Sequence, residues 1–439
     1  MTLYSTLFYA PEINELLSEK NTVGRMLQAE SALGKSQASV GIIPVQAAEL
    51  IAGCCNVNFI DLERIKSSLP LDGNAAIPLV QQLIRVVKNN DFEASKYVHL
   101  GATSQDIVDT ALVLAIRDYS NWLESRLKEL GSLLNELTSK HRSTVMIGRT
   151  LLQQAKPITF GLKTAGWLQG VMDSDQRLQE SKARVLKIQL AGAVGSGSVY
   201  LSKEVRDLFA KTLGLENGTP WQSNRGNLAE WVSDLGILSG QLGKIAKDIS
   251  LMMQTEVAEA FEGLEENKGG SSTLPHKRNP VICATVIASA QRVPHLVSSM
   301  MSGLVQEHER SAGLWQAEWE VVEQLMGLTA GSLEKTVDLI RNLEIDQHKM
   351  KQNLELTRGL IYAENVSLAL TPLLGKDKAH QWVQKACQQA IKSNSHLKDI
   401  LVASGYALPN LEELFNPELS IGNSQEMINE VLKNYENQL

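Results

Sequence analysis

Residues 112–137 read LVLAIRDYSNWLESRLKELGSLLNEL, and this stretch decides the fold. Apolar side chains return at steps of three and four residues along its whole length. The stripe consists of Leu112, Ile116, Tyr119, Leu123, Leu127, Leu130, Leu134 and Leu137. Such spacing places the apolar residues on one face of a helix, and steps close to a heptad are typical of helices that pack along their length. We therefore expect a long helix whose stripe lies in the core of a bundle.

The rest of the chain repeats this pattern. A second stripe consists of Leu228, Val232, Leu235, Leu238, Leu242, Ile245, Ile249 and Met252. Proline is absent from residues 79–156, 158–219, 221–274 and 295–371. Such tracts permit long helices, because an internal proline removes a backbone hydrogen bond and clashes with the preceding turn. Residues 160–190, 281–304 and 314–345 complete a set of about five long helices.

Convincing strand pairs are scarce, so the sequence predicts an all-α fold. We expect a small N-terminal helical domain at residues 1–104 and a central long-helix bundle at residues 105–345. A small C-terminal helical domain would follow at residues 346–439. Long helices with wide apolar stripes often bury part of that surface against another copy of the chain, so self-association is expected.

The composition is that of an ordinary globular protein. The chain has 439 residues, a formal charge of −7 and a pI near 5.7, which argues against a general nucleic-acid surface. The four cysteines form no CxxC motif, and no histidine pair has the spacing of metal ligands, so we expect neither a metal nor another cofactor. No basic segment with an apolar run opens the chain, and no apolar run reaches the length of a membrane span. A cytoplasmic location without membrane contact is the expectation.

Residues 268–281, KGGSSTLPHKRNPV, interrupt the helical pattern. Asn279 and Pro280 are typical of a helix start, and a loop that leads into a helix N-terminus suits an anion. The loop lacks the Gly-Lys-Ser/Thr of a phosphate-binding loop, and it also lacks the second glycine of a nucleophile elbow. A solvated surface loop is the alternative interpretation of these residues.

Two further segments have the same character. Residues 98–111, VHLGATSQDIVDTA, place Thr103 and Ser104 just before a long helix, where both can bind an anion or only cap the helix. Residues 148–161, GRTLLQQAKPITFG, link two long helices and carry Arg149 and Thr150. The alternative there is a polar loop with a helix start at Pro157.

Together these three segments resemble the conserved blocks of the fumarase/aspartase superfamily, in the same order and over nearly the whole chain. The resemblance implies a mostly α-helical fold, a homotetramer with a central helical bundle, and active sites shared between subunits. It also implies β-elimination or its reverse on a carboxylate substrate. By the same resemblance, Ser271 is the base that exchanges the carbon proton, and Lys277 and Asn279 hold a substrate carboxylate.

One departure narrows the reaction. Adenylosuccinate lyases of this superfamily have a histidine after Gly-Arg-Thr, and this chain has Leu151. The chain instead resembles the lactone-forming cycloisomerases of the superfamily, in TPWQSNRG (residues 219–226) and HERSAGLWQAEW (residues 308–319). In that reaction the leaving group, viewed in reverse, is a carboxylate of pKa about 4 that needs no proton donor. An adenylosuccinate lyase, another lyase of the superfamily, or an inactive structural scaffold are the alternatives.

The candidate site residues follow from this resemblance. Ser271 would exchange the carbon proton, and His99 is a second candidate for proton handling or carboxylate binding, with an orienting hydrogen bond as its ordinary alternative. The residues that would anchor a small tricarboxylate substrate are Thr103, Ser104, Arg149, Thr150, Gln222, Lys277, Asn279 and Arg310. Gly226 follows Arg225 where relatives usually have an aspartate, so the sequence assigns no role to Arg225.

Overall fold

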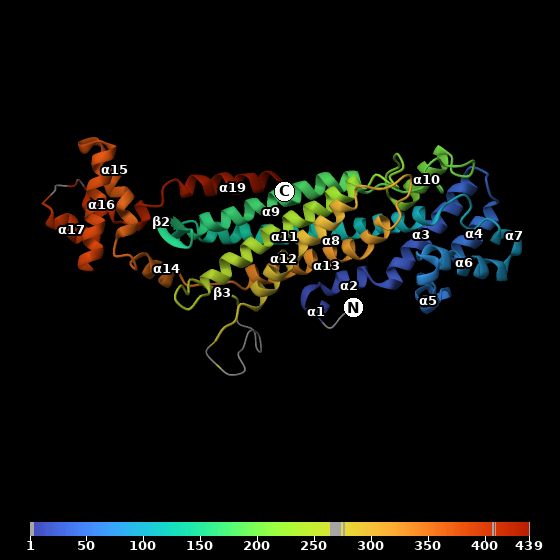
Figure 1. Cartoon of the computed structure of the whole chain (residues 1–439), viewed down its shortest axis with the longest axis horizontal. Helices are drawn as coiled ribbons and strands as arrows, with labels where there is room; N and C mark the ends of the chain where they lie inside the picture. Colours follow the sequence, from blue (N-terminus) through green and yellow to red (C-terminus); the bar gives the residue numbers. More distant parts are fainter. Residues whose placement is uncertain (1–3, 264–273, 275–276, 406–407, 409, 439) are drawn as a thin grey trace. The chain divides into compact units, whose positions relative to one another are not determined.

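The computed structural model describes residues 4–263, 274, 277–405, 408 and 410–438. Five long helices dominate the chain (Figure 1). They are α8 (Ser104–Lys140), α9 (Phe160–Val185), α11 (Gly226–Met252), α12 (Val281–Ser302) and α13 (Leu314–Arg341). The predicted all-α fold is therefore confirmed, and each of the five expected long helices forms.

Shorter helices precede, connect and follow the long ones. The first group is α1 (Ser5–Phe8), α2 (Pro11–Leu16), α3 (Glu19–Ser39), α4 (Val45–Cys54), η1 (Val57–Phe59), α5 (Leu62–Asp72), α6 (Ala76–Asn90) and α7 (Phe92–Ser95). Helix α10 (Lys203–Leu213) lies between α9 and α11 in the sequence. The last group is α14 (Gln347–Leu354), η2 (Leu360–Tyr362), α15 (Ala363–Leu374), α16 (Lys376–Ser393), α17 (Leu397–Ala403), α18 (Leu411–Leu414), η3 (Pro417–Leu419) and α19 (Ser424–Gln438).

The chain divides into two compact units, and each long helix contributes residues to both. Unit 1 contains residues 1–126, 174–240 and 288–334. Unit 2 contains residues 127–173, 241–287 and 335–439. The division into three domains at residues 104 and 345 stays a prediction.

The two stripes lie where the sequence predicts. All eight residues of the second stripe are buried, and so are the six inner residues of the first, while Leu112 and Leu137 at its ends are partly exposed. In unit 1, the rings of Tyr119 and Trp231 pack nearly at right angles, and the Tyr119 hydroxyl donates to the carbonyl of Met326 at 3.0 Å. These contacts join α8 to α11 and α13, so the stripes form the bundle core in this unit.

The N-terminal helices of unit 1 pack around the start of α8. Their shared core contains Leu33 of α3, Leu79 of α6, Phe209 of α10, and Ile107 and Leu114 of α8, all with 1% exposure or less. This core fixes the segment that precedes α8, where two of the predicted site residues lie.

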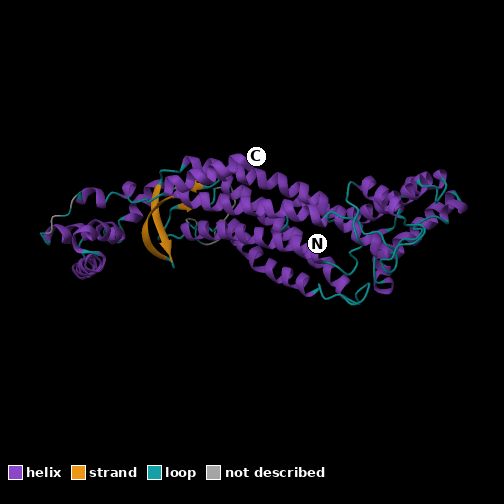
Figure 2. Cartoon of the chain, turned by 90° about the horizontal axis from the view of Figure 1, so that it is seen from above, coloured by secondary structure: helices purple, strands orange, loops and turns teal. Residues whose placement is uncertain are grey.

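Unit 2 contains a β-hairpin that the sequence prediction missed (Figure 2). Strands β1 (Val145–Thr150) and β2 (Gln153–Thr159) pair antiparallel, and Pro157 lies opposite Ile147. The alternative of a helix start at Pro157 is therefore wrong, and α9 begins at Phe160, where the long helix was expected. The hairpin forms because Met146 and Ile147 are fully buried, and a proline is tolerated in a strand that has a free edge. A second short pair joins β3 (Ala260–Phe261) to β4 (Glu344–Ile345).

Helix α12 has an unusual composition. It contains no long run of consecutive apolar residues, yet its average hydropathy over an 18-residue window reaches 1.2, and 33% of that window is buried. Among the described helices, α12 is the one that is long and apolar enough to cross a membrane, judged by length and composition alone. The core helix of a globular protein has the same properties, so this feature does not place the chain in a membrane.

A glycine at the start of α9 should be essential to unit 2. A Cβ at Gly161 would lie 2.6 Å from Cα of Arg142 and 2.9 Å from its backbone nitrogen. We expect Gly161→Ala to lower the free energy of unfolding by roughly 2 to 3 kcal/mol, because the backbone must move to relieve this overlap. Urea unfolding followed by circular dichroism measures the change.

Gly166 provides the matched control. It lies in the same helix, and apart from its chain neighbours and the nearby helix backbone, no atom of the described residues is within 4 Å of the position of its Cβ. Gly166→Ala should raise stability by about 0.5 to 1 kcal/mol, because alanine has the better helix propensity. Equal effects of the two substitutions would contradict the close approach at Gly161.

Candidate active site

The predicted site residues fall into two groups, one in each unit. Unit 1 contains His99, Thr103, Ser104, Gln222 and Arg310. Unit 2 contains Arg149, Thr150, Lys277 and Asn279. Ser271 lies outside the described residues.

Thr103 and Arg310 contact each other directly. Nη2 of Arg310 donates to Oγ1 of Thr103 at 2.9 Å and to the carbonyl of Ala193 at 3.3 Å. Nε of Arg310 donates to Oε1 of Gln105 at 3.0 Å. The guanidinium is therefore held in one orientation beside the first turn of α8, which starts at Ser104. A guanidinium beside a hydroxyl at a helix N-terminus is suited to a carboxylate ligand.

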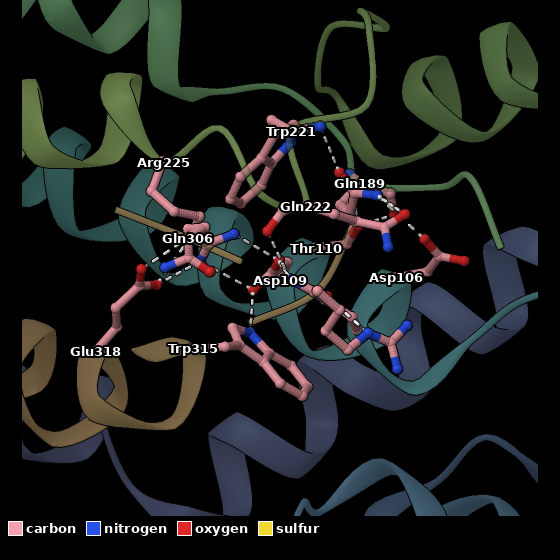
Figure 3. Close-up of polar contacts among 12 residues, drawn as sticks. Asp106, Asp109, Thr110, Gln189, Trp221, Gln222, Arg225, Gln306, Trp315 and Glu318 are labelled. Carbon is pink, nitrogen blue, oxygen red and sulfur yellow. Dashed lines mark hydrogen bonds and ion pairs between the residues drawn. The ribbon is translucent and has the colours of Figure 1, made fainter. Parts of the chain in front are cut away.

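Gln222 belongs to the same hydrogen-bond network, and Figure 3 shows it beside Gln189. Its side chain is buried, and its Nε2 donates to the carbonyl of Glu309, the residue before Arg310, at 3.4 Å. Its Oε1 accepts from Nε2 of Gln189 at 3.2 Å. Gln222 thus supports the segment that carries Arg310.

Asp106 organises the same region, and the sequence analysis did not single it out. Its carboxylate accepts from the backbone nitrogens of Thr103 at 3.0 Å, Ala191 at 2.9 Å and Gly192 at 2.9 Å. Burial raises the pKa of Asp106 to about 6, although these donors act in the opposite direction. The bond to Thr103 is half of a capping box, which the spacing Thr-x-x-Asp could have revealed.

His99 pairs with a buried carboxylate. Its Nδ1 lies 2.6 Å from Oε1 of Glu30, a residue of α3 whose side chain is 1% exposed. The backbone of His99 has a φ of 59°, in the left-handed region. Burial acts to lower the pKa of His99, but the charges of Glu30 and Asp106 raise it above its ordinary value. Glu30 thus orients the imidazole, and no local sequence pattern indicates this partner 69 residues away.

In unit 2, Arg149 forms a two-pronged ion pair. Its Nη1 and Nη2 donate to the two carboxylate oxygens of Glu259 at 2.8 and 2.7 Å. Glu259 is fully buried and also accepts from Nδ2 of Asn353 at 2.8 Å. Arg149 therefore links β1 to the segment before β3. Thr150 is exposed at the end of β1.

The turn after Thr150 exposes two leucines. Leu151 and Leu152 have φ values of 48° and 65°, and their side chains are 96% and 76% exposed. A two-residue turn with both φ values positive matches the twist of the hairpin but strains large side chains. The side chain at position 151 carries no proton donor.

The start of α12 already holds an anion. The carboxylate of Glu262 accepts from the backbone nitrogens of Ile282 at 3.1 Å and Cys283 at 2.7 Å. The sequence predicted that this helix N-terminus suits an anion. The carboxylate of Glu262 occupies the two N–H groups of Ile282 and Cys283 there. Lys277 is exposed, and Asn279 is partly buried just before the helix. Among the described residues, no three histidine, cysteine, aspartate or glutamate side chains are grouped to hold a metal ion.

Removing the charge of Glu30 should change the titration of His99. We expect Glu30→Gln to lower the pKa of His99 and to reduce the free energy of unfolding by about 1 to 2 kcal/mol near pH 6. The raised pKa stabilises the fold fully below the unfolded value of about 6.5, and this contribution is lost as the pH rises through the folded pKa. The difference between the two proteins should therefore shrink at high pH. NMR titration and urea unfolding give both quantities.

Glu19→Gln is the control for this prediction. Glu19 lies in the same helix, α3, but it is exposed and pairs with Lys66. This substitution should leave the titration of His99 unchanged. An identical pKa of His99 in the wild type and in Glu30→Gln would show that the carboxylate does not act on the imidazole.

Comparison with known proteins identifies the family. The family model described as Lyase matches residues 8–294, and the model described as Adenylosuccinate lyase C-terminus matches residues 359–431. A 3-carboxy-cis,cis-muconate cycloisomerase of Acinetobacter baylyi is 44% identical, over 98% of each chain. An adenylosuccinate lyase of Methanocaldococcus jannaschii is 33% identical, over 97% of this chain and 94% of the relative.

A solved structure supports the same assignment. The 3-carboxy-cis,cis-muconate lactonizing enzyme of Pseudomonas putida superimposes with a TM-score of 0.94 over 99% of both chains, at 39% identity. The resemblance predicted from the three sequence segments is thus confirmed, together with the all-α fold that it implied. The chain belongs to the lyase family of the fumarase/aspartase superfamily.

Proposed function

We propose that this enzyme lactonises 3-carboxy-cis,cis-muconate to 4-carboxymuconolactone, in the protocatechuate branch of the β-ketoadipate pathway. Full-length relatives that carry this activity in their names support the proposal. The structural observation that carries it is the guanidinium of Arg310, held by Thr103 and Gln105 at the start of α8. This arrangement suits one carboxylate of a tricarboxylate substrate.

The reaction forms one carbon–oxygen bond and one carbon–hydrogen bond and consumes one carbon–carbon π bond, with the proton supplied by the hydroxyl of Ser271 and restored from solvent. A substrate carboxylate adds to a conjugated double bond, and the carbon next to another carboxylate receives a proton. In reverse, a base removes this proton, and the negative charge spreads into the adjacent carboxylate. Ser271 would be that base, and cations and N–H donors must stabilise its alkoxide.

The second step needs no acid. In the reverse direction the leaving group is a carboxylate with a pKa of about 4, which is stable as an anion at neutral pH. Leu151, which replaces the histidine of adenylosuccinate lyases, supplies no proton at this position. A nitrogen leaving group would need protonation, so Leu151 favours lactonisation over cleavage of a succinyl nucleotide.

The other site residues would bind the substrate. Thr103, Ser104 and Arg310 would hold one carboxylate, and Lys277 and Asn279 would hold another. Gln222 would act beside Arg310. Arg149 and Thr150 would contribute from the hairpin, with Arg149 oriented by Glu259. His99, oriented by Glu30, would exchange protons or bind a carboxylate.

The assembly and location are part of the same proposal. A cytoplasmic homotetramer with shared active sites would bring site segments of different subunits together, as the superfamily resemblance implies. The domain limits at residues 104 and 345 would then separate the bundle from its two flanking domains.

An ultraviolet assay tests the proposed activity. The purified wild type should remove the diene absorbance of 3-carboxy-cis,cis-muconate, whereas Ser271→Ala should lose at least about a hundredfold in kcat, because the proton-exchanging group is gone. A wild type that cleaves succinyl nucleotides and leaves the diene intact would establish adenylosuccinate lyase activity instead. A Ser271→Ala variant as active as the wild type would remove Ser271 from the mechanism.

Leu151→His tests why the enzyme works without a histidine. We expect kcat to stay within roughly threefold of the wild type, because no acid is missing from the lactonisation. The exposed side chain also predicts a change in unfolding free energy of less than about 0.5 kcal/mol. A large gain in kcat would refute the argument from the leaving group.

A further inference from the structure

Arg225, to which the sequence assigns no role, lies in a fully buried ion cluster of unit 1 (Figure 3). Its Nη1 donates to Asp109 at 2.7 Å, and its Nη2 donates to Glu318 at 2.6 Å. All three side chains are at most 2% exposed. The guanidinium also lies 4.5 Å from the ring centre of Trp221. Arg225 is thereby locked between α8, α13 and the segment before α11.

Asp109, which Arg225 holds in place, also binds Gln105, one turn earlier on α8. Oδ2 of Asp109 accepts from Nε2 of Gln105 at 3.0 Å, and Oδ1 accepts from the indole of Trp315 at 3.0 Å. An ionised carboxylate only accepts hydrogen bonds, so the amide nitrogen of Gln105 must face it. The amide oxygen of Gln105 then points the other way.

That oxygen is the acceptor for Arg310. The distance from Nε of Arg310 to Oε1 of Gln105 is 3.0 Å, and Nη2 is bound to Thr103 and Ala193. The structure gives Nη1 of Arg310 no partner among the described residues. The hydrogen bonds of Nε and Nη2 thus fix the guanidinium with Nη1 available for a ligand.

We call the hydrogen bonds that lead from Arg225 through Asp109 and Gln105 to Arg310 the relay. The charge of Arg225 keeps the relay in one arrangement. A buried carboxylate that loses its cation is strongly destabilised, so Asp109 would change its hydrogen-bond partners if Arg225 lost its charge. The amide of Gln105 would then keep only one acceptor for its Nε2, the carbonyl of Gln222 at 3.1 Å, and would hold its oxygen less firmly against Nε of Arg310. A buried ion cluster seldom stabilises a fold more than apolar packing does, so stability alone gives a weak reason for this one.

We propose that Arg225 is a positioning residue for substrate binding, which acts through Asp109 and Gln105 to orient the guanidinium of Arg310. The role rests on the proposed function, in which Arg310 binds a substrate carboxylate. Arg225 itself does not touch the substrate. Its effect should therefore appear in KM, depend on Arg310, and leave kcat almost unchanged.

Steady-state kinetics with 3-carboxy-cis,cis-muconate test this role. We expect Arg225→Lys, Asp109→Asn and Gln105→Leu each to raise KM roughly tenfold or more, with kcat within about threefold, since one well-placed charged hydrogen bond is lost. In an Arg310→Gln background, the same substitutions should raise KM no further. A merely structural role would give the same KM increase with or without Arg310, and would overturn the proposal.

Arg25→Lys is the matched control. Arg25 is also a largely buried arginine of unit 1, but it binds Asp118 at 3.3 Å and the carbonyl of Leu16, away from Arg310. The Arg25→Lys variant should have a KM within about twofold of the wild-type value. An equal rise in KM for Arg25→Lys and Arg225→Lys would count against the relay.

Gln105→Leu keeps the test decisive if Arg225→Lys fails to fold, because it interrupts the relay at an uncharged residue. An unchanged KM in a folded Gln105→Leu protein overturns the inference while the proposed function stands.

If the wild type does not turn over the muconate, the proposed function fails by itself. Thermal melts of Asp109→Asn, Arg310→Gln and the double variant then test the relay: a summed loss of Tm contradicts it, and a loss no larger than that of one single variant supports it.

Discussion

The buried guanidinium of Arg225 sets the strictest geometric requirement in unit 1. A charge that is removed from water must be fully paired, or the fold loses several kcal/mol. Here α8 supplies Asp109, α13 supplies Glu318, and the segment before α11 supplies Arg225. Apolar stripes allow neighbouring helices to slide by small amounts, whereas charged hydrogen bonds do not. One side chain therefore joins α8, α13 and the segment before α11 in this unit.

A second buried charge arranges the loops around the same helix. Asp106 binds three backbone N–H groups, one from the residue before α8 and two from the chain at 191–192. Backbone donors cannot change rotamer, so this junction is rigid. Asp106 and Asp109 lie three residues apart on α8. Asp106 holds the backbone at residues 191–192, and Asp109 holds the side chains of Gln105 and Arg225. Together they hold Thr103 and Arg310 in place without any contribution from a ligand.

The sequence predicted the helices well because periodicity records burial directly. It missed the β1–β2 hairpin because a two-stranded ladder is short, and Pro157 suggested a helix start. It singled out Thr103 from the local pattern before α8, and it named Arg310 from the family resemblance. It could not pair Arg225 with Asp109 and Glu318, which lie 116 and 93 residues away. One signal was present: Asp109 continues the apolar stripe of α8 at a three-residue step before Leu112, and a charge on a buried face needs a partner.

The exposed leucine at the hairpin tip bears on how such enzymes diverge. The side chain of Leu151 contacts water over 96% of its surface, so its identity contributes little to the stability of this chain. Histidine also tolerates a left-handed backbone better than leucine does. A lineage can therefore exchange the two residues in one substitution without passing through an unstable intermediate. Under the proposed function, the choice between nitrogen and carboxylate leaving groups would be made at a position where substitution has little structural cost in this chain.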